Sequence, residues 1–350
     1  MLKTCSHCLI QEDRTNFIIV GSDGICNLCK SKEKTKAMSF EERKKIFEEM
    51  IYKVKGKYNY DGLIMLSGGK DSTYLALRLK RDYNLNLLAL TIDNGFEYED
   101  TFITSKSVST QLGIQLVTFK PSFKDVISYY KFLFTDKRLH QDDCSQICYL
   151  CGVYLKKVAS DFAKAFNIPF VFTGYDPEQI NVYGEAESIE TDPKRIMYQR
   201  NLSNKLTIMM EDTQQYVKSI GREDLLPFFQ MPDASFINYY QYFEYKPVEF
   251  MEVVKKELGW KPCKKFEHNY ITSGCKLGIV LLYLAKLNGK QTYIEKGYSS
   301  LIRDGLIDRS FIEEKYADSD NLEDIETILN NLEFEPEVRE NLLQTLIEKK

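Results

Sequence analysis

A glycine-rich segment, Ser67–Ser72, combines residue types that are suited to binding phosphate. It reads Ser-Gly-Gly-Lys-Asp-Ser, follows the apolar run Leu63–Leu66, and precedes apolar residues at helical spacing. A strand that turns through two glycines into a helix directs backbone N–H groups and the positive end of the helix dipole toward an anion. Lys70 adds a positive charge, and the Asp71 carboxylate is a ligand of the kind that Mg²⁺ prefers. We therefore predict a nucleotide phosphate site here.

The spacing of this segment distinguishes it from two common phosphate-binding loops. It is too short for Gly-x-x-x-x-Gly-Lys-Ser/Thr and lacks the Gly-x-Gly-x-x-Gly of dinucleotide folds. It resembles the SGGxDS signature of the PP-loop ATP pyrophosphatases, which cleave ATP to AMP and pyrophosphate. The alternative is an ordinary strand–helix turn. The resemblance implies an ATP site made of Ser67, Gly68, Gly69, Lys70, Asp71 and Ser72, in which Lys70 and Asp71 are catalytic.

Short apolar strands alternate with helical segments from residue 58 to 235. We expect strands over residues 63–66, 87–93, 115–119 and 169–174. Near-continuous apolar strands separated by helices indicate an α/β fold with a parallel sheet covered on both faces. Ligands bind such sheets at the carboxyl ends of the strands, so Asp93 and Gly174 are expected beside the nucleotide. Asp93 is equally well explained as the cap of a turn.

Four cysteines near the N-terminus have the spacing of a zinc site. Cys5-x-x-Cys8 and Cys26-x-x-Cys29 each direct two thiolates toward one point, and two such pairs supply four tetrahedral ligands. No coordination position is left for a substrate, so we expect structural Zn²⁺. The alternative is two unrelated reduced pairs.

A second group of cysteines lies in the middle of the chain, in Cys144-x-x-x-Cys148-x-x-Cys151-Gly, and a helix is expected after it over residues 153–166. Three interpretations remain open. The cysteines are buried and reduced, or reactive near a helix start, or ligands of a second zinc or iron–sulfur site. Cys148 and Cys151 have the spacing of a ligand pair, and Cys275, Cys144 or Cys263 would complete the set. Cys148 and Cys151 are also candidate catalytic residues.

Composition and residue pattern suggest four regions and no membrane insertion. We expect a zinc module over residues 1–35, a linker helix over 36–57, an ATP-binding domain over 58–235 and a helical substrate or partner region over 236–350. Residues 311–350 carry a net charge of −8 and the remainder +4, which fits a phosphate-bearing substrate and does not exclude tRNA. The longest apolar run is too short to span a bilayer and no signal peptide is recognisable, so we expect a cytoplasmic protein.

The order of motifs resembles the N-acetyl sugar amidotransferases, which are PP-loop enzymes of surface-polysaccharide and nonulosonic-acid pathways. The resemblance extends to Glu257–Trp260 and to the segment 298–311. It implies that ATP adenylates the acetamido oxygen of a sugar, and that ammonia from a separate glutamine amidotransferase displaces AMP to give an acetamidino group. Some basic and aromatic residues are candidates for gripping an acidic sugar, or form a solvated helix end: Lys194, Arg195, Tyr198 and Arg200.

A second resemblance is to the tRNA 2-thiolation branch of the same superfamily. It is carried by Cys148–Gly152 followed by Thr173-Gly174-Tyr175. It implies an iron–sulfur cluster on Cys148, Cys151 and a third cysteine, with sulfur transferred to a tRNA. The mild basicity and the lack of a second zinc finger in the C-terminal half count against this alternative.

Overall fold

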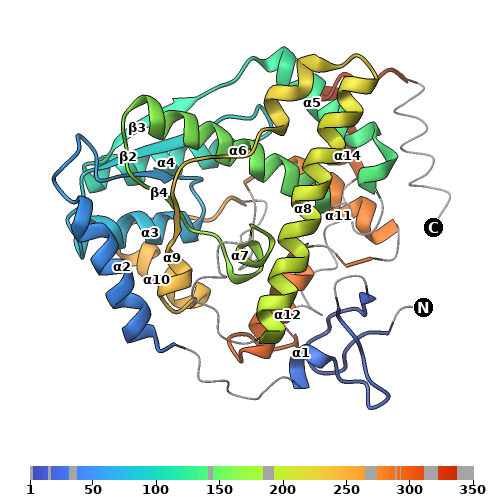
Figure 1. Cartoon of the computed structure of the whole chain (residues 1–350), viewed down its shortest axis with the longest axis horizontal. Helices are drawn as coiled ribbons and strands as arrows, with labels where there is room; N and C mark the ends of the chain where they lie inside the picture. The colour runs from blue at the N-terminus through green and yellow to red at the C-terminus, as the bar shows by residue number, and fades with distance from the viewer. Residues whose placement is uncertain are drawn as a thin grey trace.

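A five-stranded, all-parallel sheet occupies one half of the protein, on the left of Figure 1. Four of its strands were predicted, each to within two residues, and the α/β fold class is confirmed. The strand order is β3-β2-β1-β4-β5. The strands are β1 (Gly62–Met65), β2 (Leu87–Ile92), β3 (Gln115–Phe119), β4 (Val171–Thr173) and β5 (Phe236–Asn238).

The computed structural model describes residues 3–14, 17–30, 38–140, 145–183, 193–264, 274–287, 290–291, 293–310 and 322–336. Helices in these ranges surround the sheet. They are α1 (Asn27–Lys30), α2 (Phe40–Val54), α3 (Lys70–Arg81), α4 (Glu99–Leu112), α5 (Phe123–Thr135), α6 (Ser145–Ala165), α7 (Pro177–Tyr183), α8 (Pro193–Ser219), α9 (Tyr239–Tyr242), α10 (Pro247–Leu258), α11 (Leu277–Leu287), α12 (Tyr293–Arg303) and α14 (Leu322–Asn331), with 3₁₀ turns η2 (Lys137–His140) and η3 (Glu223–Phe229).

The direction in which the sheet grows reverses at β1. The chain runs outward from β1 to β2 and β3, then returns to form β4 and β5 on the other side of β1. A crevice forms at the carboxyl ends of the strands at such a reversal, here between β1 and β4. The segment Ser67–Ser72 leaves β1 at this point, and Gly174 follows β4.

The two faces of the sheet carry two apolar cores. Leu63 and Leu88 pack with residues of α5, α6 and α8, whereas Ile64 and Ala89 pack with residues of α2, α3 and α10. Successive residues of a strand point to opposite faces, so both faces are apolar only when both are covered. This explains why β1 and β2 are near-continuous apolar runs.

Helix α2, expected as a linker, is part of the core. Ser39 begins it with a reciprocal capping box to Glu42, and Phe47 and Ile51 are fully buried. The Phe47 ring lies 6.3 Å from that of Phe172 on β4 and 5.8 Å from that of Tyr239 on α9. The helix therefore belongs with the α/β domain.

Two elements differ from the sequence-based boundaries. Strand β5 pairs with β4 in register Val171↔Phe236, so the sheet continues one strand past the expected domain end at residue 235. Helix α6 begins at Ser145, whereas the sequence suggested a start at Val153. Cys148 and Cys151 consequently lie inside the first two turns of a long helix.

The N-terminal cysteine module packs against helices from much later in the chain. Cys5, Cys8 and Cys26 share an apolar cluster with Tyr198 of α8 and Ile302 of α12. The module lies beside the ends of these two helices (Figure 1). Its position is therefore determined by tertiary contacts as well as by its connection to α2.

Candidate functional site

The loop Ser67–Ser72 has the backbone geometry of a phosphate-binding turn. Gly68 has φ +71°, and Gly69 caps helix α3, which starts at Lys70. A Cβ atom on Gly68 would lie 2.6 Å from the carbonyl oxygen of Thr101 on α4, so only glycine fits. Because only four residues separate the end of β1 from the start of α3, the unpaired N-terminal amides of α3 lie at the carboxyl edge of the sheet.

Ser72 shapes the loop from inside. Its buried hydroxyl donates to the carbonyl of Gly69 at 3.2 Å and accepts from the backbone N–H of Ser67 at 3.2 Å. The same oxygen lies 3.1 Å from the Ser67 hydroxyl. Ser72 therefore holds the turn closed, while Ser67 is exposed.

Lys70 and Asp71 form a buried ion pair at the start of α3. The distance between Lys70 Nζ and Asp71 Oδ2 is 2.8 Å, and the Lys70 side chain is only 5% exposed. The second oxygen, Asp71 Oδ1, is buried and accepts no hydrogen bond of ordinary geometry among the described residues, although the buried Tyr245 hydroxyl interacts with this carboxylate. A buried carboxylate oxygen in this condition is costly unless a ligand or cation completes it.

Asp176, three residues after the end of β4, is close enough to this pair for the charges of Asp71 and Lys70 to act on it. Burial, together with the charges of Asp71 and Glu178, raises the pKa of Asp176 to about 6. Its Oδ1 accepts from the backbone N–H groups of Glu178 and Gln179 at 2.8 and 2.9 Å, which caps helix α7. Two neighbouring carboxylates beside a lysine can hold Mg²⁺ together with phosphate. Asp176 was not predicted as a site residue, although its place after a strand was the available signal.

Two aromatic side chains from the C-terminal half fasten the loop. Trp260 Nε1 donates to the carbonyl of Gly68 at 2.9 Å, and the Tyr240 hydroxyl donates to the carbonyl of Asp71 at 2.8 Å. Both side chains are buried. No local pattern in the sequence revealed these two bonds.

Of the two expected strand-end residues, Gly174 lies against the loop and Asp93 is held elsewhere. Gly174 packs on the backbone of Asp71 and Ser72. Asp93 Oδ1 accepts from the Gly95 N–H at 2.8 Å, and its Oδ2 lies 3.0 Å from Lys120 Nζ. Asp93 thus forms the turn after β2, one of its two expected roles.

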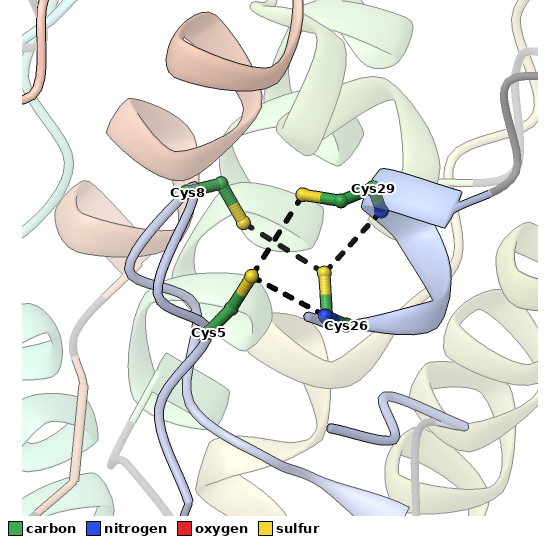
Figure 2. A group of neighbouring side chains, drawn as sticks. All are labelled: Cys5, Cys8, Cys26 and Cys29. Atoms are coloured by element: carbon green, nitrogen blue, oxygen red, sulfur yellow. Dashed lines mark hydrogen bonds between the residues drawn. The ribbon is translucent and has the colours of Figure 1, made fainter. Parts of the chain in front are cut away.

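The four N-terminal cysteines converge on one point (Figure 2). All four sulfur atoms lie within 4.8 Å of one another, and the Cys5–Cys29 and Cys8–Cys26 pairs are 3.8 Å apart. A tetrahedral ion with metal–sulfur bonds near 2.3 Å requires sulfur atoms roughly 3.8 Å apart. The residues therefore fit a single metal ion. A hydrogen bond from the Cys26 thiol lowers the pKa of Cys8 to about 4, and Arg303 acts in the same direction.

The second group of cysteines meets near the carboxyl end of β2. Cys148 and Cys151 lie one turn apart on α6, and Cys275 pairs with Glu97 in an isolated antiparallel bridge. The Cys151 sulfur lies 3.2 Å from the Tyr130 hydroxyl. Burial raises the pKa of Cys275 well above the ordinary thiol value, and Glu97, Cys151 and Cys148 all add to the shift.

These three sulfur atoms are not arranged for a single ion. Among the described residues, the N-terminal group is the one set of three or more candidate ligands within 4.8 Å. An iron–sulfur cluster bonds each thiolate to a different iron and so accepts sulfur atoms farther apart. The thiols of Cys148, Cys151 and Cys275 remain candidates for such a cluster, and Cys144 lies outside the described residues.

The cysteine group is adjacent to the nucleotide loop. Gly274, which precedes Cys275, packs against Thr101 and the Glu97 carboxylate, and Thr101 in turn packs against Gly68. Burial and the charge of Asp93 raise the pKa of Glu97 to about 7. One edge of the sheet therefore carries the second cysteine group, the Glu97 carboxyl with its raised pKa, and the Ser67–Ser72 loop.

Gly152, the residue after Cys151, has a packing role. A Cβ atom there would overlap the Tyr183 hydroxyl at the end of α7. Tyr183 also stacks at a tilt on Tyr175, with ring centroids 5.0 Å apart. The Cys-x-x-Cys-Gly pattern thus lets α6 approach α7.

Similarity to known proteins is limited. No protein-family model matches the chain. An uncharacterized protein of Methanocaldococcus jannaschii is 25% identical over 175 residues, which cover 49% of this chain and 58% of that protein. The cytoplasmic tRNA 2-thiolation protein 1 of Drosophila willistoni is 26% identical over 126 residues, 33% of this chain and 34% of that protein. The chain therefore spans about a third to three fifths of these relatives.

Solved structures with a similar arrangement include a U34-tRNA thiolase, NcsA from Methanococcus maripaludis with its 4Fe–4S cluster. It has 19% identity and a TM-score of 0.36, covering 79% of this chain and 80% of that one. The NMN synthetase of Francisella tularensis has 15% identity and a TM-score of 0.35, covering 77% and 94%. At these scores the likeness assigns no function. No described helix has the length and apolarity needed to cross a membrane.

Proposed function

We propose that the protein is an AMP-forming PP-loop ATP pyrophosphatase. The observation that carries the proposal is the buried Lys70–Asp71 pair at the start of α3, with a spare carboxylate oxygen of Asp71 near Asp176. ATP lies with its phosphates on the Ser67–Ser72 loop, Lys70 neutralises phosphate charge, and Asp71 with Asp176 holds Mg²⁺.

The reaction proceeds in two displacements. An acceptor oxygen attacks the α-phosphate of ATP, its bond to the pyrophosphate breaks, and an adenylated acceptor forms. A nucleophile then attacks the acceptor carbon, and the bond to the oxygen breaks so that AMP leaves. The protein contributes positioning and charge neutralisation, which are the main terms in phosphoryl and nucleotidyl transfer.

The position of the second cysteine group favours sulfur as the transferred atom. The second group consists of Cys148, Cys151 and Cys275 and lies beside Glu97. Thr101 packs between Gly274, the residue before Cys275, and Gly68 of the loop. Ammonia transfer requires no thiols near the adenylate. An iron–sulfur cluster held by these cysteines would supply sulfide to an adenylate on the loop. The acceptor in this version is a base carbonyl of a tRNA, in line with the name of one curated relative.

An N-acetyl sugar amidotransferase is the second candidate. Glu257–Trp260 is part of the resemblance to that family, and Trp260 holds the Gly68 carbonyl of the loop. In this version the acceptor is an acetamido oxygen, and a separate glutamine amidotransferase supplies ammonia. Tyr198, considered as a grip for such a sugar, is buried and bonded to Glu178, while the side chains of Lys194 and Arg195 lie outside the description.

One measurement distinguishes the two candidates. The full chain is purified anaerobically and analysed for zinc, iron, acid-labile sulfide and visible absorption. Sulfur transfer predicts iron and sulfide that disappear in Cys148→Ala and persist in the control Lys80→Ala, which keeps every cysteine. Zinc alone, at one ion per chain, would refute the sulfur version and leave the amidotransferase.

The nucleotide step is tested separately by ATP–pyrophosphate exchange with candidate acceptors. Lys70→Ala and Asp71→Ala are expected to abolish exchange, and Lys80→Ala, on the same helix, is the control. Full exchange in both loop variants would refute the ATP site.

A further inference from the structure

Helix α7, which carries the Asp176 cap at its start, is held from behind by a polar cluster. Glu178, in its first turn, is buried, and its Oε1 accepts from the Tyr198 hydroxyl of α8 at 2.8 Å. Its Oε2 lies 3.4 Å from the Asn181 amide nitrogen. A buried carboxylate needs such partners, so Tyr198 helps to determine where the start of α7 lies.

The same cluster reaches the N-terminal metal module. Arg303, the last residue of α12, donates from Nη1 to the sulfur of Cys8 at 3.5 Å. Its guanidinium also interacts electrostatically with Glu178 and Tyr198. Arg303 therefore stands between a candidate metal ligand and the helix that positions Asp176.

Packing joins the same parts. Tyr198 of α8 and Ile302 of α12 belong to the apolar cluster built on the module cysteines. A divalent ion with four thiolates carries a net negative charge, which Arg303 can balance at Cys8 while it faces Glu178. Metal binding to the module therefore fixes the position of Cys8, which accepts from Arg303. Glu178 of α7 interacts with the same guanidinium.

We propose that Arg303 and Tyr198 are positioning residues that couple the N-terminal metal module to the nucleotide crevice. They hold Glu178 and the start of α7 so that Asp176 faces Asp71. In this arrangement the module does more than stabilise its own fold, because its metal occupancy sets the affinity for MgATP. The coupling rests on the proposed ATP site.

The matched pair for a test is Arg303→Met and Arg309→Met. Arg309 also ties the module to the C-terminal half of the chain, because its Nη1 donates to the Ser6 carbonyl at 2.6 Å. The full chain is assayed for metal content, for KM of MgATP and kcat in exchange, and for hydrogen exchange of the α7 amides.

We expect Arg303→Met to keep one metal per chain and raise the KM for MgATP about tenfold, the effect of losing a charged hydrogen bond. Amide exchange in α7 should rise with it. Arg303→Lys should recover part of the affinity, and Arg309→Met should leave KM and α7 unchanged. If Arg303→Met does not fold, Tyr198→Phe, which removes one hydroxyl, carries the same expectation at a smaller size.

Unchanged α7 exchange and KM in Arg303→Met and Tyr198→Phe would overturn the coupling. Equal effects in Arg303→Met and Arg309→Met at unchanged metal content would also overturn it, since Arg303 would then have no particular role in the coupling. A wild-type chain that neither binds MgATP nor exchanges pyrophosphate refutes the proposed function instead, while α7 exchange still reports on the contact with the module.

Discussion

The two cysteine groups of this protein are built in opposite ways. The N-terminal four come from two short knuckles, with paired sulfur atoms 3.8 Å apart. The second group joins two residues of α6 to Cys275, which reaches them through a bridge to Glu97. The first is a local structure, and the second exists only after the sheet has formed.

The chemistry of the two groups differs accordingly. Backbone N–H groups donate to the Cys5 and Cys26 sulfur atoms at 3.3 Å, as in a closed metal site. In the second group, burial raises the pKa of Cys151 to about 11, so without a metal this thiol is protonated at neutral pH. Any ion or cluster there must displace a proton. The first group is thus a closed metal site near α12, and the second is a set of buried thiols near the phosphate loop.

The largest expected effect separates the two groups by stability. Cys26→Ser removes a metal ligand and is expected to cost ~3 kcal/mol or more of unfolding free energy, because metal binding and folding of the module are linked. Cys148→Ser is expected to change stability by less than about 1 kcal/mol. Thermal unfolding with metal analysis checks both. Equal losses would contradict the conclusion that only the first group is a closed metal site on which folding depends.

A second prediction concerns activity without loss of either cysteine group. Asp71→Asn keeps the size of the side chain and removes the charge that pairs with Lys70 and, in the proposed ATP site, with Mg²⁺. AMP formation is expected to fall by about a hundredfold or more, as when a charge-stabilising group is removed from a catalytic site. Metal content should equal that of the wild type. Loss of metal in this variant would show that the loop and the cysteine groups are not independent.

A third prediction concerns how closely α6 packs against α7 beside the second cysteine group. Gly152→Ala places a methyl group against the Tyr183 hydroxyl and is expected to cost about 1–3 kcal/mol, the usual range for overpacking. Tyr183→Phe in the same chain should recover most of the loss. The midpoint of thermal unfolding measures both the loss and the recovery. Gly113→Ala is unsuitable as a control, because Gly113 has φ +62° and any side chain there strains the backbone. No rescue by Tyr183→Phe would argue against this contact.

The smallest expected effect is at the two hydrogen bonds that Trp260 and Tyr240 donate to backbone carbonyls of the loop. Trp260→Phe removes the donor to the Gly68 carbonyl, a loss of about 1 kcal/mol, so the KM for ATP should rise about fivefold. Tyr240→Phe, which removes the donor to Asp71, should behave alike. Steady-state exchange at varied ATP measures both variants, and an unchanged KM would assign these bonds to packing alone.

Much of the fold was readable from local pattern. Four strands, the loop and the cysteine knuckles follow from apolar runs and from residue spacing, which are short-range signals. Strand β5 was missed because three residues, Phe236–Asn238, carry too little pattern to be distinguished from a loop. Helix α2 was underestimated since burial of Phe47 depends on rings from β4 and α9.

The sequence by itself determined a glycine turn with Lys70 and Asp71 at a helix start and a four-cysteine metal module, because in each case neighbouring residues supply all the groups. Only the tertiary structure decided which distant side chains complete them. Trp260 on Gly68, Asp176 opposite Asp71 and Cys275 beside Cys151 are brought together by the reversal of the sheet at β1 and by long-range packing. No spacing along the chain encodes such encounters.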